Sequence, residues 1–174
     1  CGGWKRWGWG MSATLRGCFL LSVVTAMILL ANGSESSYSA FQIIIGWLAT
    51  MPVALFEEAA FRSLLFLSLR EQMSPLKAAL LSSLIFAVFH IEAQPVYGWP
   101  DIFVYGLGAC AALHNGVGLA WLILSHLLVD GIWYHFNIIG HISLKVLLVH
   151  RITVLVTIIV SIVLLWKKTH ADSA

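Results

Sequence analysis

Charged residues are scarce in this chain. Lysine and arginine together number 10 and aspartate and glutamate 8, so 10% of the 174 residues are charged, whereas 60% are hydrophobic. An average soluble domain has about 25% charged residues, and this chain has too few to cover a globule of its size with polar surface. The composition excludes an ordinary water-soluble domain and predicts an integral membrane protein in contact with the lipid bilayer. The length suits one compact helical bundle.

Cysteines and clusters of positive charge are also few. The cysteines, Cys1, Cys18 and Cys110, are scattered along the chain, so they predict neither a disulfide framework nor a metal cluster. No basic patch alternates with polar surface, which argues against nucleic acid as a partner. The sequence also contains no HExxH motif and no internal repeat.

Long apolar runs occupy most of the chain. They cover residues 17–32, 41–69, 76–91, 101–113, 117–139 and 145–166. A transmembrane helix needs about 20 apolar residues, with a range of roughly 17–25. We expect the runs at 17–32, 41–69, 117–139 and 145–166 to cross the membrane. The run at 76–91 is short but can extend, and the run at 101–113 needs shielding by its neighbours or forms a re-entrant or tilted segment. We predict an all-α integral membrane protein, a bundle of about six transmembrane helices with a buried polar site.

Positive charges gather on one side of the expected bundle. The bundle covers residues 17–166, between an interfacial segment at 1–16 and a polar tail at 167–174. With about six crossings both termini lie on one side, and the positive-inside rule predicts a multi-pass cell-membrane protein with both termini in the cytoplasm. The basic residues on that side are Lys5, Arg6, Arg16, Arg70, Lys77, Lys167 and Lys168.

Two adjacent carboxylates, Glu57 and Glu58, lie within the second apolar run. A charge in hydrocarbon costs at least about 2.5–3.5 kcal/mol on insertion scales, so intramembrane carboxylates are candidate functional groups. On a helix Glu58 and Arg62 share a face, whereas Glu57 is turned by about 100° from Glu58. The spacing predicts that Arg62 neutralises Glu58 and that Glu57 points into the bundle. The alternative interpretation is that Glu57, Glu58 and Arg62 only hold helices together through polar contacts.

Imidazoles follow in the third and fifth runs. His90 shares a helix face with Phe86, and His126 shares a face with Asp130. A lone histidine at a helix end is more often structural than catalytic, and a His–Asp pair could simply lock two helices together. However, Glu57, His90 and His126 lie roughly 18, 21 and 13 Å from the expected cytoplasmic ends of their runs, near the middle of a core about 30 Å thick. We therefore expect these runs to bring their polar groups to one site.

Two breaks between runs carry turn or cap signals. Ser74–Pro75 fits a helix start, with the serine capping and the proline at the first helical position, and Asn115–Gly116 indicates a tight turn. The other histidines fall mostly at turns or run ends, where we expect interfacial or solvated side chains. They are His114, His135, His141, His150 and His170.

The polar residues form three motifs in a fixed order. These are Glu57-Glu58-x-x-x-Arg62, Phe86-x-x-x-His90 and His126-x-x-x-Asp130. Together they resemble the CPBP intramembrane proteases, which include the type II CAAX prenyl endopeptidases and the related bacteriocin-processing or self-immunity (Abi) proteins. The resemblance covers residues 41–139, including the glycine-containing stretch 103–118, although many members have Asn where this chain has Asp130. It implies an endopeptidase that cleaves a peptide or protein substrate. That substrate is a prenylated C-terminal tail in the CAAX branch and a peptide precursor or another membrane protein in the bacterial branch.

Peptide hydrolysis requires an activated water and a stabilised oxyanion. Glu57 is the candidate general base, and Glu58, held by its arginine, would orient the site. His90 could share the water with Glu57, while His126 and Asp130 would face the scissile carbonyl.

A metal would change these roles. His90, His126 and Asp130 are candidate ligands of zinc (Zn2+), with one position left open for water. An ionised Asp130 is a good metal ligand or histidine orienter, but it can donate to an oxyanion only when protonated. Asp130 therefore slightly favours a metal, and the resemblance also implies a metalloprotease, although no HExxH helix is present. A metal-free glutamate mechanism stays open at this point.

Two other functions fit the same residues. A non-catalytic immunity or scaffold protein would keep the polar cluster for packing alone. A proton- or ion-coupled transporter also uses intramembrane Glu, His and Asp, but the small size and the absence of a repeated half argue against it.

Overall fold

The computed structural model describes residues 39–93, 98–137 and 144–171, and every regular element in these ranges is a helix. The order is α3 (Ala40–Glu57), η1 (Glu58–Phe66), α4 (Leu67–Gln72), α5 (Pro75–Phe89), α6 (Trp99–His114), α7 (Leu119–Asn137) and α8 (Leu144–Ala171). The all-α prediction is confirmed for the described residues. The expected N-terminal segment at 1–16 and the first apolar run at 17–32 lie outside them. α8 continues to Ala171, into the segment expected as a polar tail.

Local chemistry explains where several helices begin and end. α3 starts with a capping box, in which the Ser39 hydroxyl accepts from the Gln42 N–H at 3.3 Å and the Gln42 side chain accepts from the Ser39 N–H at 2.9 Å. α5 starts at Pro75 as predicted, although the Ser74 side chain makes no cap hydrogen bond. The predicted turn after α6 is present, and Gly116 has a φ of 96°, a conformation that glycine adopts without steric cost.

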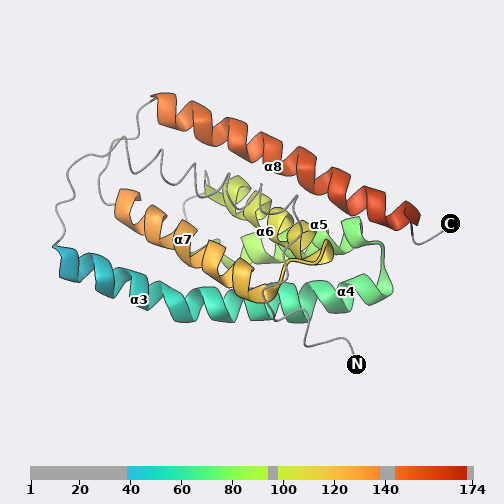
Figure 1. The fold of residues 1–174 in the computed structure, drawn as a ribbon, viewed down its shortest axis with the longest axis horizontal. Coiled ribbons are helices and arrows are strands. Elements are labelled where there is room, and N and C mark those ends of the chain that lie inside the picture. Colours follow the sequence, from blue (N-terminus) through green and yellow to red (C-terminus); the bar gives the residue numbers. More distant parts are fainter. Residues whose placement is uncertain (1–38, 94–97, 138–143, 172–174) are drawn as a thin grey trace.

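α3, η1 and α4 form one continuous rod, but its middle is a π-helix (Figure 1). The π-helix η1 begins at Glu58, directly after the first site carboxylate. π-helical turns are rare and often occur at functional sites. In η1 the Phe61 carbonyl accepts a hydrogen bond from the Ser82 hydroxyl of α5 at 2.9 Å, so a neighbouring helix bonds to the backbone of this segment. The second run is therefore a π-helix instead of a regular α-helix over residues 58–66, although Glu58 and Arg62, four positions apart, still meet.

α6 lies in the middle of the bundle. It packs against α5, α8, η1 and α7, and Figure 1 shows it between α7 and α8. Small residues allow this close packing: a Cβ on Gly106 would lie 3.1 Å from Ser83 Cβ of α5, and a Cβ on Gly108 would lie 3.1 Å from Thr157 Cγ2 of α8. The short fourth run is thus a helix shielded by its neighbours.

α3 also packs closely against α7. A Cβ on Gly131 would lie 2.6 Å from Cε2 of the Trp47 ring, so the indole rests directly on the α7 backbone. This contact fixes how α3 and α7 are aligned, at a position next to Asp130 in the sequence.

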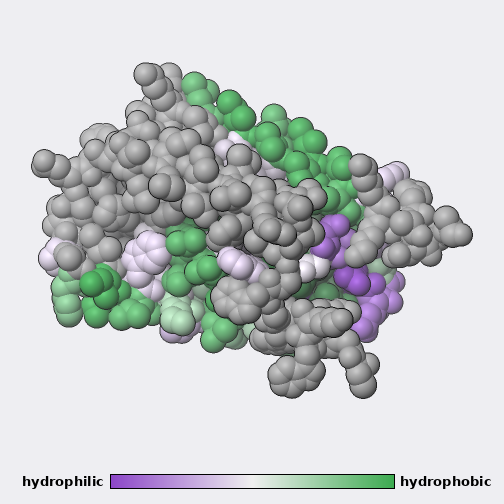
Figure 2. Space-filling view, viewed as in Figure 1, coloured by the Kyte–Doolittle hydropathy of each residue, from purple (hydrophilic) through white to green (hydrophobic). Residues whose placement is uncertain are grey.

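The outward faces of α3 and α8 are apolar. Figure 2 shows hydrophobic surface along these helices and a hydrophilic patch at the end where α4 meets α5. Exposed apolar surface of this extent marks a membrane or protein contact. In the described ranges one helical stretch, Ile44–Gln72, is long and apolar enough to cross a membrane alone. Shorter apolar helices are Pro75–Phe89, Leu119–Gly131 and Arg151–Trp166, and a total of about six transmembrane helices stays a prediction.

The expectation for His114 is wrong. Its side chain is only 5% exposed, whereas an interfacial or solvated position was expected. The reason is that the connection after α6 is itself packed into the core, since Val117 and Leu119 are also buried.

Candidate active site

The polar side chains of the three motifs meet at one place in the bundle. Glu57 ends α3, η1 supplies Glu58 and Arg62, the residue after α5 is His90, and α7 supplies His126 and Asp130. Each of them lies within 4.0 Å of at least one other. The structure therefore brings together all the residues that the sequence singled out.

Glu58 and Arg62 form the innermost pair. Arg62 Nε lies 3.3 Å from Glu58 Oε2, and both side chains are buried, as the helical spacing predicted. The Arg62 guanidinium also lies over the Phe86 ring, with Cζ 4.0 Å from the ring centroid, a favourable cation–π position. The buried charge is thus paired on one side and covered by a ring on the other.

His126 connects this pair to Glu57. Its Nδ1 lies 2.8 Å from Glu58 Oε1, and a carboxylate oxygen accepts, so Nδ1 carries the proton. The same bond fixes the orientation of the ring, so that Nε2 points away from Glu58. Nε2 faces Glu57 Oε2 and Asp130 Oδ2, each at 3.5 Å.

His90 approaches Glu57 from the opposite side. Its Nδ1 lies 2.8 Å from the Phe86 carbonyl oxygen, which can only accept, so this ring is also protonated on Nδ1. Its Nε2 lies 3.4 Å from Glu57 Oε1. The Glu57 carboxylate is therefore held between the Nε2 atoms of two imidazoles, each oriented by a bond at its Nδ1.

The site is more exposed at one edge. The exposed fraction of the side chain is 0% for Glu58 and 5% for Glu57, but 17% for His90 and 31% for Asp130. Glu57 is thus buried beside the more exposed side chains of His90 and Asp130, while Glu58 and Arg62 form the closed end.

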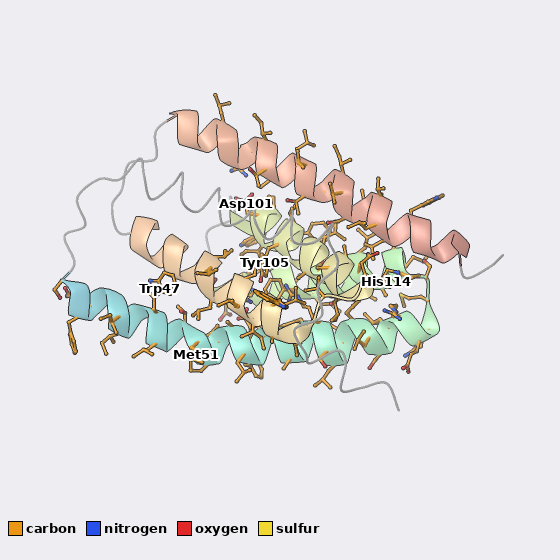
Figure 3. All side chains as sticks on the ribbon, in the orientation of Figure 1. Trp47, Met51, Asp101, Tyr105 and His114 are labelled. Atoms are coloured by element: carbon orange, nitrogen blue, oxygen red, sulfur yellow. The ribbon has the colours of Figure 1, made fainter. Side chains whose placement is uncertain are left out.

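Aromatic side chains complete the site, and sequence reasoning assigned no role to Tyr105 among them. The Phe86 ring contacts His90, with centroids 4.6 Å apart, and His126, with centroids 6.2 Å apart. The Tyr105 ring lies 4.9 Å from the His126 ring, and Figure 3 shows Tyr105 on α6 in the middle of the bundle. The apolar run that became α6 contains no motif, so nothing in the sequence distinguishes Tyr105 from a packing residue.

The zinc expectation can be compared with this arrangement. The side-chain types of His90, His126 and Asp130 suit zinc. Within the described ranges, however, no group of three or more His, Cys, Asp or Glu side chains is placed to hold a metal ion. As arranged here these residues do not form a ligand set, and zinc binding stays a prediction.

The fold and the site together define a helical membrane protein with a carboxylate–imidazole centre buried in apolar surroundings. Residues 39–132, more than half of the chain, match the family described as type II CAAX prenyl endopeptidase Rce1-like. The chain therefore belongs to this family of membrane-embedded proteases, which confirms the resemblance found in the motifs. No curated protein and no solved structure matches the chain. All the candidate site residues lie inside the matched range, whereas α8 lies outside it.

Proposed function

We propose that this chain is an intramembrane endopeptidase in which Glu57 activates the attacking water. The observation that carries this proposal is the position of the Glu57 carboxylate, 3.4 Å from His90 Nε2 and 3.5 Å from His126 Nε2 in a buried site. A general base must lie within reach of the proton that it removes. Glu57 lies beside the more exposed edge of the site, where a water and a peptide bond can approach.

The reaction follows from these positions. Glu57 takes one proton from water, the resulting hydroxide oxygen bonds to the scissile carbonyl carbon, and the carbonyl electron pair moves to oxygen. His90 holds the water beside Glu57. The oxyanion electron pair then re-forms the C=O bond, and the C–N bond breaks as the proton on Glu57 passes to the leaving nitrogen. The products are a carboxylic acid and an amine, which exchange a proton to become a carboxylate and an ammonium group.

The oxyanion needs hydrogen-bond donors that are already in place. Asp130 donates when its carboxyl group is protonated, and His126 donates from Nε2 as an imidazolium, in which both ring nitrogens carry protons. Glu58 Oε1 accepts from His126 Nδ1 at 2.8 Å and so holds the ring with Nε2 towards the oxyanion. Glu58 and Arg62 thus act on the oxyanion through His126.

A prenylated peptide is the substrate class that the family description favours. A lipid chain gains about 0.8 kcal/mol per buried CH₂, so a prenylated tail concentrates in the bilayer that surrounds the site. A bacteriocin-type precursor without a prenyl group is the alternative substrate, and a folded but non-catalytic immunity or scaffold protein is the alternative function.

Cleavage by the protein reconstituted in liposomes tests the proposal. The substrates are a fluorogenic CAAX peptide in farnesylated form and the same peptide without the farnesyl group. General acid–base catalysis contributes typically about 10²–10⁴-fold, so Glu57→Gln should lower kcat by at least about 100-fold. Glu71→Gln is the matched control, because Glu71 is an exposed carboxylate on the same rod, and it should cleave like the wild type.

The outcomes separate the alternatives. Wild-type rates in Glu57→Gln would overturn the general base. A folded wild-type protein that cleaves neither peptide would favour the scaffold function, and cleavage of the unprenylated peptide alone would favour the bacteriocin-type substrate. Metal analysis of the same samples tests zinc: stoichiometric zinc, with activity lost to a chelator and restored by zinc, would overturn the metal-free mechanism.

A further inference from the structure

Tyr105 touches the catalytic centre from a helix that carries none of the three motifs. Its hydroxyl lies 3.4 Å from Glu58 Oε1, and its ring lies 4.9 Å from that of His126 and 5.5 Å below Arg62 Cζ. It is thus placed against the residues at the closed end of the site. α6 supplies no charged group to this centre, so Tyr105 is its polar contribution.

The hydroxyl adds a second hydrogen-bond donor to the Glu58 carboxylate. Oε1 accepts from His126 Nδ1 at 2.8 Å and from the Tyr105 hydroxyl at 3.4 Å, while Oε2 lies 3.3 Å from Arg62 Nε in an ion pair. These partners come from α7, α6 and η1, so the carboxylate is restrained from three helices. Without the Tyr105 hydroxyl, the Oε1 atom of Glu58 would keep only the hydrogen bond from His126 among those of the described residues.

The ring restrains His126 in a second way. The imidazole has the Tyr105 ring at 4.9 Å, inclined by 53°, and the Phe86 ring at 6.2 Å, inclined by 80°. Rotation of the imidazole about its Cβ–Cγ bond would place Cδ2 instead of Nδ1 beside Glu58, and it has to displace these rings. Both the hydroxyl and the ring therefore favour the orientation in which His126 Nδ1 meets Glu58 and Nε2 meets Glu57.

We propose that Tyr105 is a positioning residue that fixes the tautomer and orientation of His126 through Glu58 and through ring contact. The catalytic consequence of this inference rests on the proposed function, because His126 Nε2 stabilises the oxyanion there. Tyr105 itself touches neither the water nor the scissile bond.

The test combines kinetics with nitrogen NMR of the full chain. The protein is labelled with 15N-histidine in detergent micelles, and the His126 ring signals are assigned by their loss in His126→Gln. In the wild type we expect the tautomer protonated on Nδ1. Tyr105→Phe keeps the ring and removes the hydroxyl, so the Nε2-protonated tautomer should become visible. Its kcat should fall about threefold to tenfold with KM unchanged, which corresponds to the net contribution of one hydrogen bond.

Two further variants serve as comparison. Tyr105→Leu also removes the ring and should lower kcat further than Tyr105→Phe. Phe103→Leu changes an aromatic residue of the same helix that packs against the apolar core, and it should leave both the His126 signals and kcat unchanged. Because Tyr105→Phe is nearly isosteric, it keeps the test decisive even if the leucine variant does not fold.

The results distinguish this inference from the proposed function. Unchanged His126 signals in Tyr105→Phe would overturn the positioning role, whatever the kinetics show. If the tautomer shifts in Tyr105→Phe but the wild-type protein cleaves no peptide, the positioning role is upheld and the protease function is overturned. An equal loss of kcat in Tyr105→Phe and Phe103→Leu would indicate a general packing effect and would also overturn it.

Discussion

Arg62→Met removes the positive charge beside Glu58 while keeping a long apolar side chain beneath Phe86. Both members of the pair are buried, with Nε and Oε2 3.3 Å apart. Removing one partner of a buried ion pair typically costs about 3–5 kcal/mol, because the other charge is left uncompensated. Glu58 keeps hydrogen bonds from His126 and Tyr105, so we expect a loss near the lower limit, about 3 kcal/mol. This is a large part of a folding free energy that is about 5–15 kcal/mol in typical proteins.

A double-mutant cycle separates the unpaired charge from lost packing. Unfolding is followed in mixed micelles by titration with a denaturing detergent for the wild type, Arg62→Met, Glu58→Gln and the double variant. The double variant should be more stable than Arg62→Met by at least about 1 kcal/mol, since no carboxylate is then left without its partner. A stability of Arg62→Met within about 0.5 kcal/mol of the wild type, or strictly additive losses, would refute the idea that the two charges depend on each other.

Three further changes have defined outcomes. Asp130→Asn places a donor beside His126 at every pH, whereas Asp130 donates only when protonated. The wild-type kcat should therefore fall with rising pH where this proton is lost, and the kcat of the variant should not. Identical pH–rate profiles would contradict this role of Asp130. Gly131→Ala puts a methyl group 2.6 Å from the Trp47 ring and should lower the free energy of unfolding by about 1–3 kcal/mol. Adding Trp47→Leu to this variant should restore part of the lost stability. An unchanged unfolding midpoint in Gly131→Ala would argue against this contact. Arg151→Ala removes an ion pair with Asp101 at 2.8 Å, but the Arg151 side chain is 47% exposed, so the loss in the unfolding titration should stay below about 1 kcal/mol.

Local spacing made much of this site predictable. Residues four apart on a helix meet whatever surrounds them, and the pairs Glu58–Arg62 and His126–Asp130 are both present. Carboxylates and imidazoles are expensive in an apolar run, so their positions pointed to the helices that share a site. The helical class followed from composition for the same reason, because few polar groups were available to cover a soluble fold.

Features that depend on distant contacts were not predictable. Tyr105 meets Glu58 across 47 positions of sequence, and a tyrosine in an apolar run looks like any other packing residue. The π-helix depends on its surroundings, including the bond from Ser82 of α5 to the Phe61 carbonyl. His114 appeared to belong to an open turn, but the following residues pack into the core. No feature of the sequence near His114 indicates that burial.

The α-helical part of the rod before the π-helix also limits how this protein can change. Loss or gain of a single residue between Trp47 and Glu57 would rotate everything before it by about 100° relative to everything after it. Trp47 would leave Gly131, and part of the lipid-facing side of α3 would be forced into the bundle. The chain can therefore exchange side chains along this rod far more readily than it can alter the rod's length.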